Sequence, residues 1–194
     1  YSWDVGGGVN FAALYAYYLA SPVNWLIILC PKAYIIEFMT YMIVFKIGLS
    51  GLTFAWYLRK HGRAGDFGAA FFGIFYALSG YMAAYSWNIM WLDCIWLFPL
   101  IMWGLERLVR EKKGLLYGVT LGLSILSNYY ISIMICLFMV IYFVSLLILE
   151  KRKRWGDYLK ICGQFAAYSL LAGGMAAVVL LPEIFALQMT ASGD

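Results

Sequence analysis

The sequence predicts an all-α fold: a polytopic bundle of about six transmembrane helices, preceded by a helical segment that lies in the membrane interface. Of the 194 residues, 64% are hydrophobic and 12% are charged, whereas a soluble domain carries about 25% charged residues. Apolar runs recur that approach the ~20 residues needed to cross a bilayer, and clusters of Lys and Arg occupy alternate gaps between them. These observations exclude a water-soluble domain, and no basic stretch with interleaved aromatic residues indicates a nucleic-acid partner.

The N-terminal segment is expected to lie on, or dip into, the outer surface of the membrane instead of crossing it. Residues 11–30 are apolar enough to span, but Ser21-Pro22 interrupts a helix there. A crossing at this point would also place the basic residues 59–63 outside. We therefore expect a single transmembrane domain over residues 1–194, with an outer interfacial segment (1–34) and a helix bundle (35–194), and we interpret the chain as a fragment of a longer protein.

The spans and their direction follow from the charges between them. Three basic clusters, at residues 59–63, at 107–113 and at 151–154 with Lys160, hold 12 of the 14 Lys and Arg residues. Positive charge stays in the cytoplasm, so these gaps are expected inside and both ends of the chain outside. The expected spans are residues 38–58, 67–85, 89–104, 114–127, 131–149 and 161–181.

Asp93 is the charged residue that most needs an explanation. It is the single charged residue between positions 67 and 105, and a carboxylate at bilayer depth costs about 2.5–3.5 kcal/mol on insertion scales. The 40 residues between Asp66 and Arg107 just suffice for two crossings, so the outer turn must be tight and close to Trp87. Asp93 would then lie about 9 Å below that turn, in a polar pocket. Asp93 has two interpretations: a hydrated carboxylate that caps a helix, or a functional group.

Lys46 lies near the middle of its span, far from either face of the membrane. Its ammonium group is expected to face a cavity and to meet a phosphate or a carboxylate. Glu37 lies nine positions earlier, about half a helical turn out of phase, so it is not the expected partner.

Other polar residues have two interpretations each. Asp4 precedes a run of three glycines and Asn10; glycines let backbone amides approach an anion, and they equally make a flexible loop. Asn88 and Asn128 fall at outer turns, where turn chemistry explains them and where they could also bind a sugar. Glu183 follows Pro182 at the outer end of the last span and is either a solvated residue or a site residue.

Several stretches of this sequence, in order and spacing, resemble the bacterial YfhO-type membrane proteins. The resemblance covers nearly the whole chain, and the block from Trp87 to Asp93 is its most specific part. The other stretches are residues 6–11, 17–22, 46–49, 76–81 and 127–130.

This resemblance implies a GT-C-like fold and a GT-C-type glycosyltransferase of the bacterial cell membrane. Such enzymes take a sugar from a polyprenyl-phosphate carrier at the outer face, and the implied acceptor is a cell-envelope polymer such as teichoic acid. Enzymes of this type carry a catalytic acid in the first outer loop, where this chain has Asp4. Relatives often place that acid further upstream, in a part that this chain does not include.

The chemistry of sugar transfer assigns roles to these residues. A carboxylate, Asp93 or Asp4, would take the proton of the acceptor hydroxyl, and Lys46 would stabilise the leaving phosphate. The sequence identifies no particular cofactor, and a divalent metal remains an option. The expected partners are the donor, the acceptor polymer and membrane lipids. The expected substrate-binding residues are Lys46, Asn10, Asn88, Trp91, Asn128, Tyr129 and Glu183.

Two other functions compete with this one. A polytopic transporter or flippase of lipids or sugars would also carry charges within the membrane, but transporters favour internal repeats and a site near the midplane. The sequence shows no repeat, and its polar residues gather toward the outer side. A scaffold without catalytic function would leave Asp93 and Lys46 unexplained.

Overall fold

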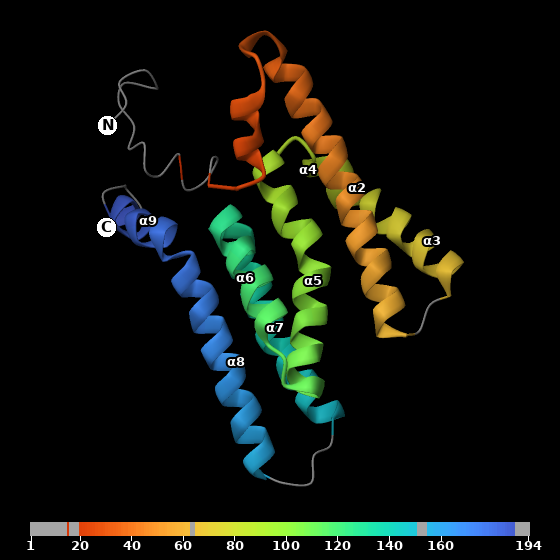
Figure 1. Cartoon of the computed structure of the whole chain (residues 1–194), viewed down its shortest axis with the longest axis vertical. Helices are drawn as coiled ribbons and strands as arrows, with labels where there is room; N and C mark the ends of the chain where they lie inside the picture. Colours follow the sequence, from red (N-terminus) through yellow and green to blue (C-terminus); the bar gives the residue numbers. More distant parts are fainter. Residues whose placement is uncertain (1–14, 16–19, 63–64, 151–154, 189–194) are drawn as a thin grey trace.

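A computed structural model describes residues 15, 20–62, 65–150 and 155–188, without the side chains of residue 183 and residues 185–188 (Figure 1). The expectations for Asp4 and Asn10 therefore lie outside the described residues. Within those ranges the chain forms helices and short connections and no strand. The elements are η2 (Asn24–Leu29), η3 (Lys32–Tyr34), α2 (Ile35–His61), α3 (Asp66–Ala77), α4 (Gly80–Tyr85), α5 (Ile89–Glu111), α6 (Leu115–Ser127), α7 (Tyr129–Leu149), α8 (Trp155–Met175) and α9 (Ala177–Gln188).

This architecture confirms the predicted helical membrane bundle. Four helical stretches are long and apolar enough to cross a membrane: Lys32–His61, Asp66–Tyr85, Ile89–Glu111 and Tyr129–Leu149. The fourth predicted span, α6, is apolar but has only 13 residues. Two predicted spans are interrupted in the structure, one between α3 and α4 at Leu78-Ser79 and one at Ala176 between α8 and α9.

The helix ends follow local chemistry. α2 ends at Gly62, which has a φ of 80°, a left-handed conformation that glycine adopts without strain. The tight turn expected near Trp87 is the connection between α4 and α5. α5 runs without a break through Pro99, which cannot donate to the carbonyl of Ile95. Tyr76 of α3 donates its hydroxyl hydrogen to that carbonyl at 2.8 Å, so the freed acceptor is satisfied.

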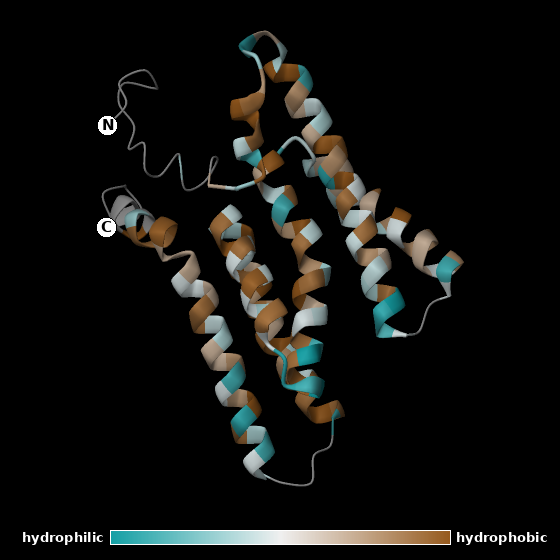
Figure 2. Cartoon of the chain, viewed as in Figure 1, coloured by the Kyte–Doolittle hydropathy of each residue, from teal (hydrophilic) through white to brown (hydrophobic). Residues whose placement is uncertain are grey.

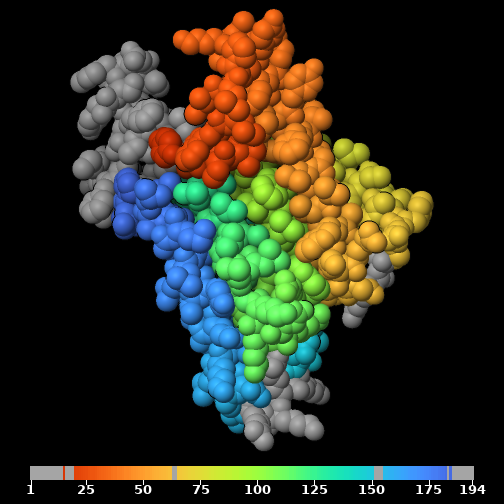
Figure 3. Space-filling view, in the orientation of Figure 1, coloured from red at the N-terminus to blue at the C-terminus, as the bar shows by residue number. Residues whose placement is uncertain are grey.

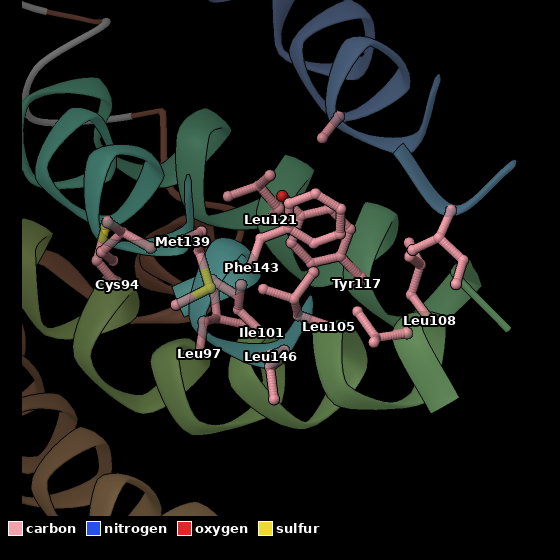
Figure 4. Close-up of a cluster of buried hydrophobic side chains, with 14 of the residues drawn as sticks. Cys94, Leu97, Ile101, Leu105, Leu108, Tyr117, Leu121, Met139, Phe143 and Leu146 are labelled. Atoms are coloured by element: carbon pink, nitrogen blue, oxygen red, sulfur yellow. The ribbon is translucent and has the colours of Figure 1, made fainter. Parts of the chain in front are cut away.

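Helix α5 is the centre of the bundle, and its apolar side chains pack against α6, α7 and α8 (Figure 4). Close approach of α5 and α6 depends on Gly104, since a Cβ there would lie 2.5 Å from the backbone nitrogen of Tyr117. Close approach of α2 and α3 depends on Gly51, where a Cβ would lie 3.0 Å from the carbonyl oxygen of Gly73.

Three other glycines do not mediate close helix packing, although glycines within apolar spans are typical of such packing and predict it from the sequence. Gly48, Gly173 and Gly174 suggested close helix packing, as Gly51 did. A Cβ added at any of the three would meet nothing within 4 Å. These positions face open space, so that interpretation was wrong for them.

The outer surface of the bundle is strongly apolar. Many large hydrophobic side chains are more than half exposed, among them Phe67 (86%), Ile36 (80%) and Leu170 (76%). An exposed apolar surface of this extent suits contact with lipid. Figure 2 shows the hydrophobic residues along the helices, with hydrophilic residues gathered at the lower ends of α2 and α5 in that view.

Those hydrophilic ends define what we call the basic end of the bundle, where α2 and α5 end and α8 begins. Arg110 pairs with Glu150 at 2.9 Å, which ties the end of α5 to the end of α7. Lys112 lies 3.9 Å from Asp157 at the start of α8. The opposite end, which we call the Asp93 end, contains the turns at Trp87 and Asn128 and the segment of residues 20–34 (Figure 1). The alternation of charged and uncharged connections predicted from the sequence is therefore present in the fold.

Candidate functional site

Lys46 and Asp93, the two charged residues that the sequence placed within the membrane, form one ion pair. The Lys46 ammonium nitrogen lies 2.7 Å from Asp93 Oδ2, and the side chains are 0% and 1% exposed. Lys46 comes from α2 and Asp93 from the second turn of α5. The pair therefore joins these two helices near the Asp93 end.

Every proton of the Lys46 ammonium group has an acceptor. Besides Asp93, it donates to Asn24 Oδ1 at 2.6 Å and to the backbone carbonyl of Ile89 at 3.1 Å. Asp93 is equally well satisfied. Its Oδ2 also accepts from the Ser21 hydroxyl at 2.6 Å, and its Oδ1 accepts from Trp96 Nε1 at 3.0 Å. A buried ion pair is tolerated when its remaining donors and acceptors are satisfied in this way.

The segment that precedes α2 covers this pair. Ser21 and Asn24, which contact Asp93 and Lys46, both belong to it. In Figure 3 the residues from 20 to 34 lie over the end of the bundle beside α2. Ser21 is fully buried, so the start of this segment packs into the end of the bundle. The surroundings of Asp93 are polar, but they are closed, whereas the sequence led us to expect that Lys46 faces a cavity.

Asn88 and Trp91 lie at the start of α5, on a different face of the helix from Asp93. Asn88 is 4% exposed, and its amide nitrogen has no hydrogen-bond partner among the described residues. The indole nitrogen of Trp91 is also buried and has no partner within that part of the chain. Two buried donors without acceptors are unusual, since most buried polar groups are paired.

Asn128 supports the turn interpretation. It is fully buried, and its Oδ1 accepts from the backbone nitrogen of Ile131 at 3.0 Å, which caps α7. The neighbouring Tyr129 lines an apolar cavity of about 340 Å³ together with residues of α6, α7 and α9. Asn128 and Tyr129 belong to the connection between α6 and α7 and to the start of α7, whereas the Lys46–Asp93 pair joins α2 and α5.

The remaining predicted site residues lie outside this description. Asp4 and Asn10 belong to residues that the structure does not describe, and Glu183 lies in α9 with its side chain undescribed. Among the described residues no group of three or more His, Cys, Asp or Glu side chains could hold a metal ion.

Sequence reasoning missed a second buried carboxylate, Glu106, at the basic end. Its Oε1 accepts from the hydroxyls of Tyr57 and Tyr142, each at 2.7 Å. Its Oε2 faces His61 Nδ1 at 2.9 Å and Arg110 Nη1 at 3.4 Å. Glu106 is 0% exposed, so this cluster ties α2, α5 and α7 together at the basic end as the Lys46–Asp93 pair ties α2 and α5 at the other.

A signal for Glu106 was present in α2. Buried residues of α2 include Lys46, Ser50, Thr53 and Tyr57, which recur at the spacing of one helix face. A polar stripe in an apolar helix points to the bundle interior, where it needs partners. Tyr57 at the lower end of this stripe is the residue that meets Glu106.

Comparisons with known proteins place this chain in a family. The sequence profile of the family described as "Bacterial membrane protein YfhO" matches residues 1–193. A protein of Bacillus subtilis (strain 168) described as "Uncharacterized protein YfhO" is 26% identical over 207 aligned positions, which cover 95% of this chain. This chain spans 23% of the length of that relative. No solved structure matches the chain significantly.

Proposed function

Because the chain belongs to the YfhO family of bacterial membrane proteins, we propose that it is the part of a membrane glycosyltransferase that contains the reacting groups. The reaction moves a sugar from a polyprenyl-phosphate carrier to a cell-envelope polymer such as teichoic acid. The observation that carries this proposal is the buried Lys46–Asp93 pair at one end of the bundle. A charged pair at that depth is costly in a bundle that serves only as a scaffold.

The roles of the two side chains follow from the bonds that change. The bond between the sugar and the phosphate oxygen breaks, and a bond between the sugar and the acceptor oxygen forms. Asp93 takes the proton of the acceptor hydroxyl, and Lys46 stabilises the negative charge on the departing polyprenyl phosphate. Asp4 is the second candidate for the base. A divalent metal at the phosphate remains compatible with this scheme.

The closed pair must open for this chemistry. Two residues of the covering segment hold these groups. The Ser21 hydroxyl donates to the Asp93 carboxylate, and the Asn24 side-chain oxygen accepts from the Lys46 ammonium group. Movement of this segment on donor binding would free both groups at once. The closed arrangement is thus the resting state of the proposed site, and water is kept from the reacting groups until the donor arrives.

The proposed sidedness matches the substrates. The basic end faces the cytoplasm under the positive-inside rule, and the Asp93 end and both ends of this chain face the outside. The proposed site then opens toward the outer leaflet, where the acceptor polymer is located. Asn10, Asn88, Trp91, Asn128, Tyr129 and Glu183 are proposed substrate-binding residues.

A reconstitution experiment tests the proposal. The full-length parent protein is placed in liposomes with a radiolabelled sugar on undecaprenyl phosphate and with teichoic acid as acceptor. We expect radiolabel to appear in the polymer. Two results would contradict a transferase: the donor lipid loses its label but the polymer gains none, or the folded protein leaves the label on the donor lipid.

One observation favours a second function, a lipid or sugar transporter. The α2–α5 interface carries a buried polar cluster near each of its ends, around Asp93 and around Glu106. Two such clusters could act as alternating gates. In the same liposomes, movement of the labelled lipid between leaflets without transfer to the polymer would identify this function.

A further inference from the structure

The first turn of α5 presents two buried hydrogen-bond donors that no described residue uses. They are Asn88 Nδ2 and Trp91 Nε1. Asn88 is the N-cap residue of α5 and Trp91 follows three positions later, so both belong to the beginning of this helix. Leaving a buried donor unsatisfied destabilises the protein. A ligand that brings acceptors to these donors would remove that destabilisation.

The donors suit a neutral ligand group. An amide and an indole N–H are uncharged, and the nearest described cation on α2, Lys46, already donates to Asn24, Ile89 and Asp93. A phosphate would require a cation for its charge, whereas sugar hydroxyls are neutral acceptors and donors. The arrangement therefore fits the sugar of a donor better than its phosphate.

Aromatic rings surround the same position. The ring of Trp91 lies 5.8 Å from that of Tyr85 and 6.3 Å from that of Tyr130, measured between centroids. Tyr85 and Tyr130 are 44% and 46% exposed, so part of each ring is accessible. An amphipathic ring of this kind offers an apolar face and a polar edge, which suits a sugar with its C–H groups on one face and hydroxyls at its rim.

An apolar groove lies further along α5, and its lining does not include Asn88 or Trp91. It has a volume of about 360 Å³ and lies between α3, α4, α5 and α7. Ile95 and Phe98, which line it, follow Trp91 by four and seven residues and so continue its helix face. A polar subsite above an apolar groove matches an amphipathic ligand, with a hydrocarbon chain in the groove and a sugar at the top.

We infer that Asn88 and Trp91 form the sugar subsite of the donor, with the isoprenoid chain in the groove lined by Ile95 and Phe98. This inference rests on the proposed glycosyltransferase function. In it, the two N–H groups bind sugar hydroxyls, and the Trp91 ring packs against the sugar. In this inference Asn88 and Trp91 select the sugar, and the proton transfer of the proposed function stays with Asp93.

The test measures how much the sugar contributes to binding. The full-length protein in detergent is titrated with undecaprenyl phosphate and with the same lipid carrying glucose, galactose or N-acetylglucosamine, and the dissociation constants are compared by native mass spectrometry. Two neutral hydrogen bonds to the sugar predict that the wild type binds at least one sugar-bearing lipid about tenfold or more tightly than bare undecaprenyl phosphate. In Trp91→Phe and Asn88→Leu this preference should fall toward parity, while the affinity for bare undecaprenyl phosphate stays unchanged.

Trp103→Phe is the matched control. Trp103 lies on the same helix near the opposite end, where its ring meets that of Trp56, and this variant should keep the full preference. A wild type without any preference, or a preference that survives in both Asn88→Leu and Trp91→Phe, overturns the subsite. If the subsite fails this test but the wild-type protein still labels the polymer in liposomes, the glycosyltransferase function stands and only the subsite is wrong. If the wild-type protein labels no polymer, the proposed function itself is wrong.

Discussion

At the scale of single residues, burying Lys46 and Asp93 costs desolvation free energy. Their mutual attraction and hydrogen bonds offset that cost only when both side chains are present. The ammonium group donates to three acceptors and the carboxylate accepts from three donors. Removing one partner leaves a buried charge without compensation, whereas replacing both by apolar side chains leaves none.

A double-mutant cycle tests that description. Lys46→Met should lower the free energy of unfolding by about 3–5 kcal/mol, and Asp93→Leu by a similar amount. The double variant should be more stable than either single variant, because no charge is left unpaired. Thermal unfolding in detergent measures all four proteins. Additive losses in the double variant would show that the two side chains do not form the pair.

Two asparagines at neighbouring turns predict opposite results. Asn128 caps α7 through Ile131, so Asn128→Ala should lower the free energy of unfolding by about 1 kcal/mol. Asn88 has an amide nitrogen without a partner in the described residues, so Asn88→Leu should leave stability unchanged or raise it by about 1 kcal/mol. The same thermal unfolding assay compares them. A clear loss of stability in Asn88→Leu would mean that its side chain holds the fold together.

The sequence identified Asp93 and Lys46 as residues in need of partners, but it could not pair them. They lie 47 positions apart, on helices whose relative rotation depends on tertiary packing. Ser21 and Asn24 were missed as partners because hydrophilic residues beside a proline are typical of a turn. Glu106 was missed because it precedes Arg107 in a charged cluster, which reads as a solvated helix end.

At the scale of the elements, small residues determine where helices touch. Gly104 lets α6 approach the backbone of α5, and Gly48 lies on an exposed face of α2 with nothing near it. The sequence located both glycines inside helices but could not separate them, since both interrupt apolar runs in the same way. The ends of the helices were easier to predict than the contacts between them, because charged clusters and turn residues mark helix ends.

These glycines make a matched pair of substitutions. Gly104→Ala should destabilise the bundle by about 1–3 kcal/mol, because the new Cβ would overlap the backbone at Tyr117. Gly48→Ala should be neutral or stabilising by up to about 1 kcal/mol, because alanine favours the helix. Unfolding temperatures in detergent measure the contrast. Equal effects from the two substitutions would be inconsistent with the packing of α5 against α6.

At the scale of the whole molecule, the fold separates a basic end from an end that holds the proposed site. The sequence predicted this separation because the charges recur in alternate gaps, a pattern that does not depend on tertiary detail. It predicted less about the interruptions at Leu78-Ser79 and Ala176, where no proline or charge marks the break. The cover over Asp93 was also beyond prediction, because a short segment can fold back over a bundle in many ways.

Cysteine labelling tests the proposed direction in the membrane. In a background without the accessible native cysteines, Trp87→Cys and Lys113→Cys each place one thiol at an exposed position at opposite ends. A membrane-impermeant maleimide should label Trp87→Cys in intact cells, and Lys113→Cys only after the cells are permeabilised. Labelling in the reverse order would invert the topology and move the proposed site to the cytoplasm.

The central claim is that Asp93 takes part in sugar transfer, beyond holding two helices together, and the most direct test compares two buried carboxylates of the same helix. Sugar transfer to the polymer is measured per folded full-length protein in liposomes for the wild type, Asp93→Asn and Glu106→Gln. General-base catalysis predicts a loss of about 100-fold or more in Asp93→Asn, while Glu106→Gln, at the basic end, should retain transfer within severalfold of the wild type. Transfer that persists in Asp93→Asn, or falls equally in both variants, would contradict the account.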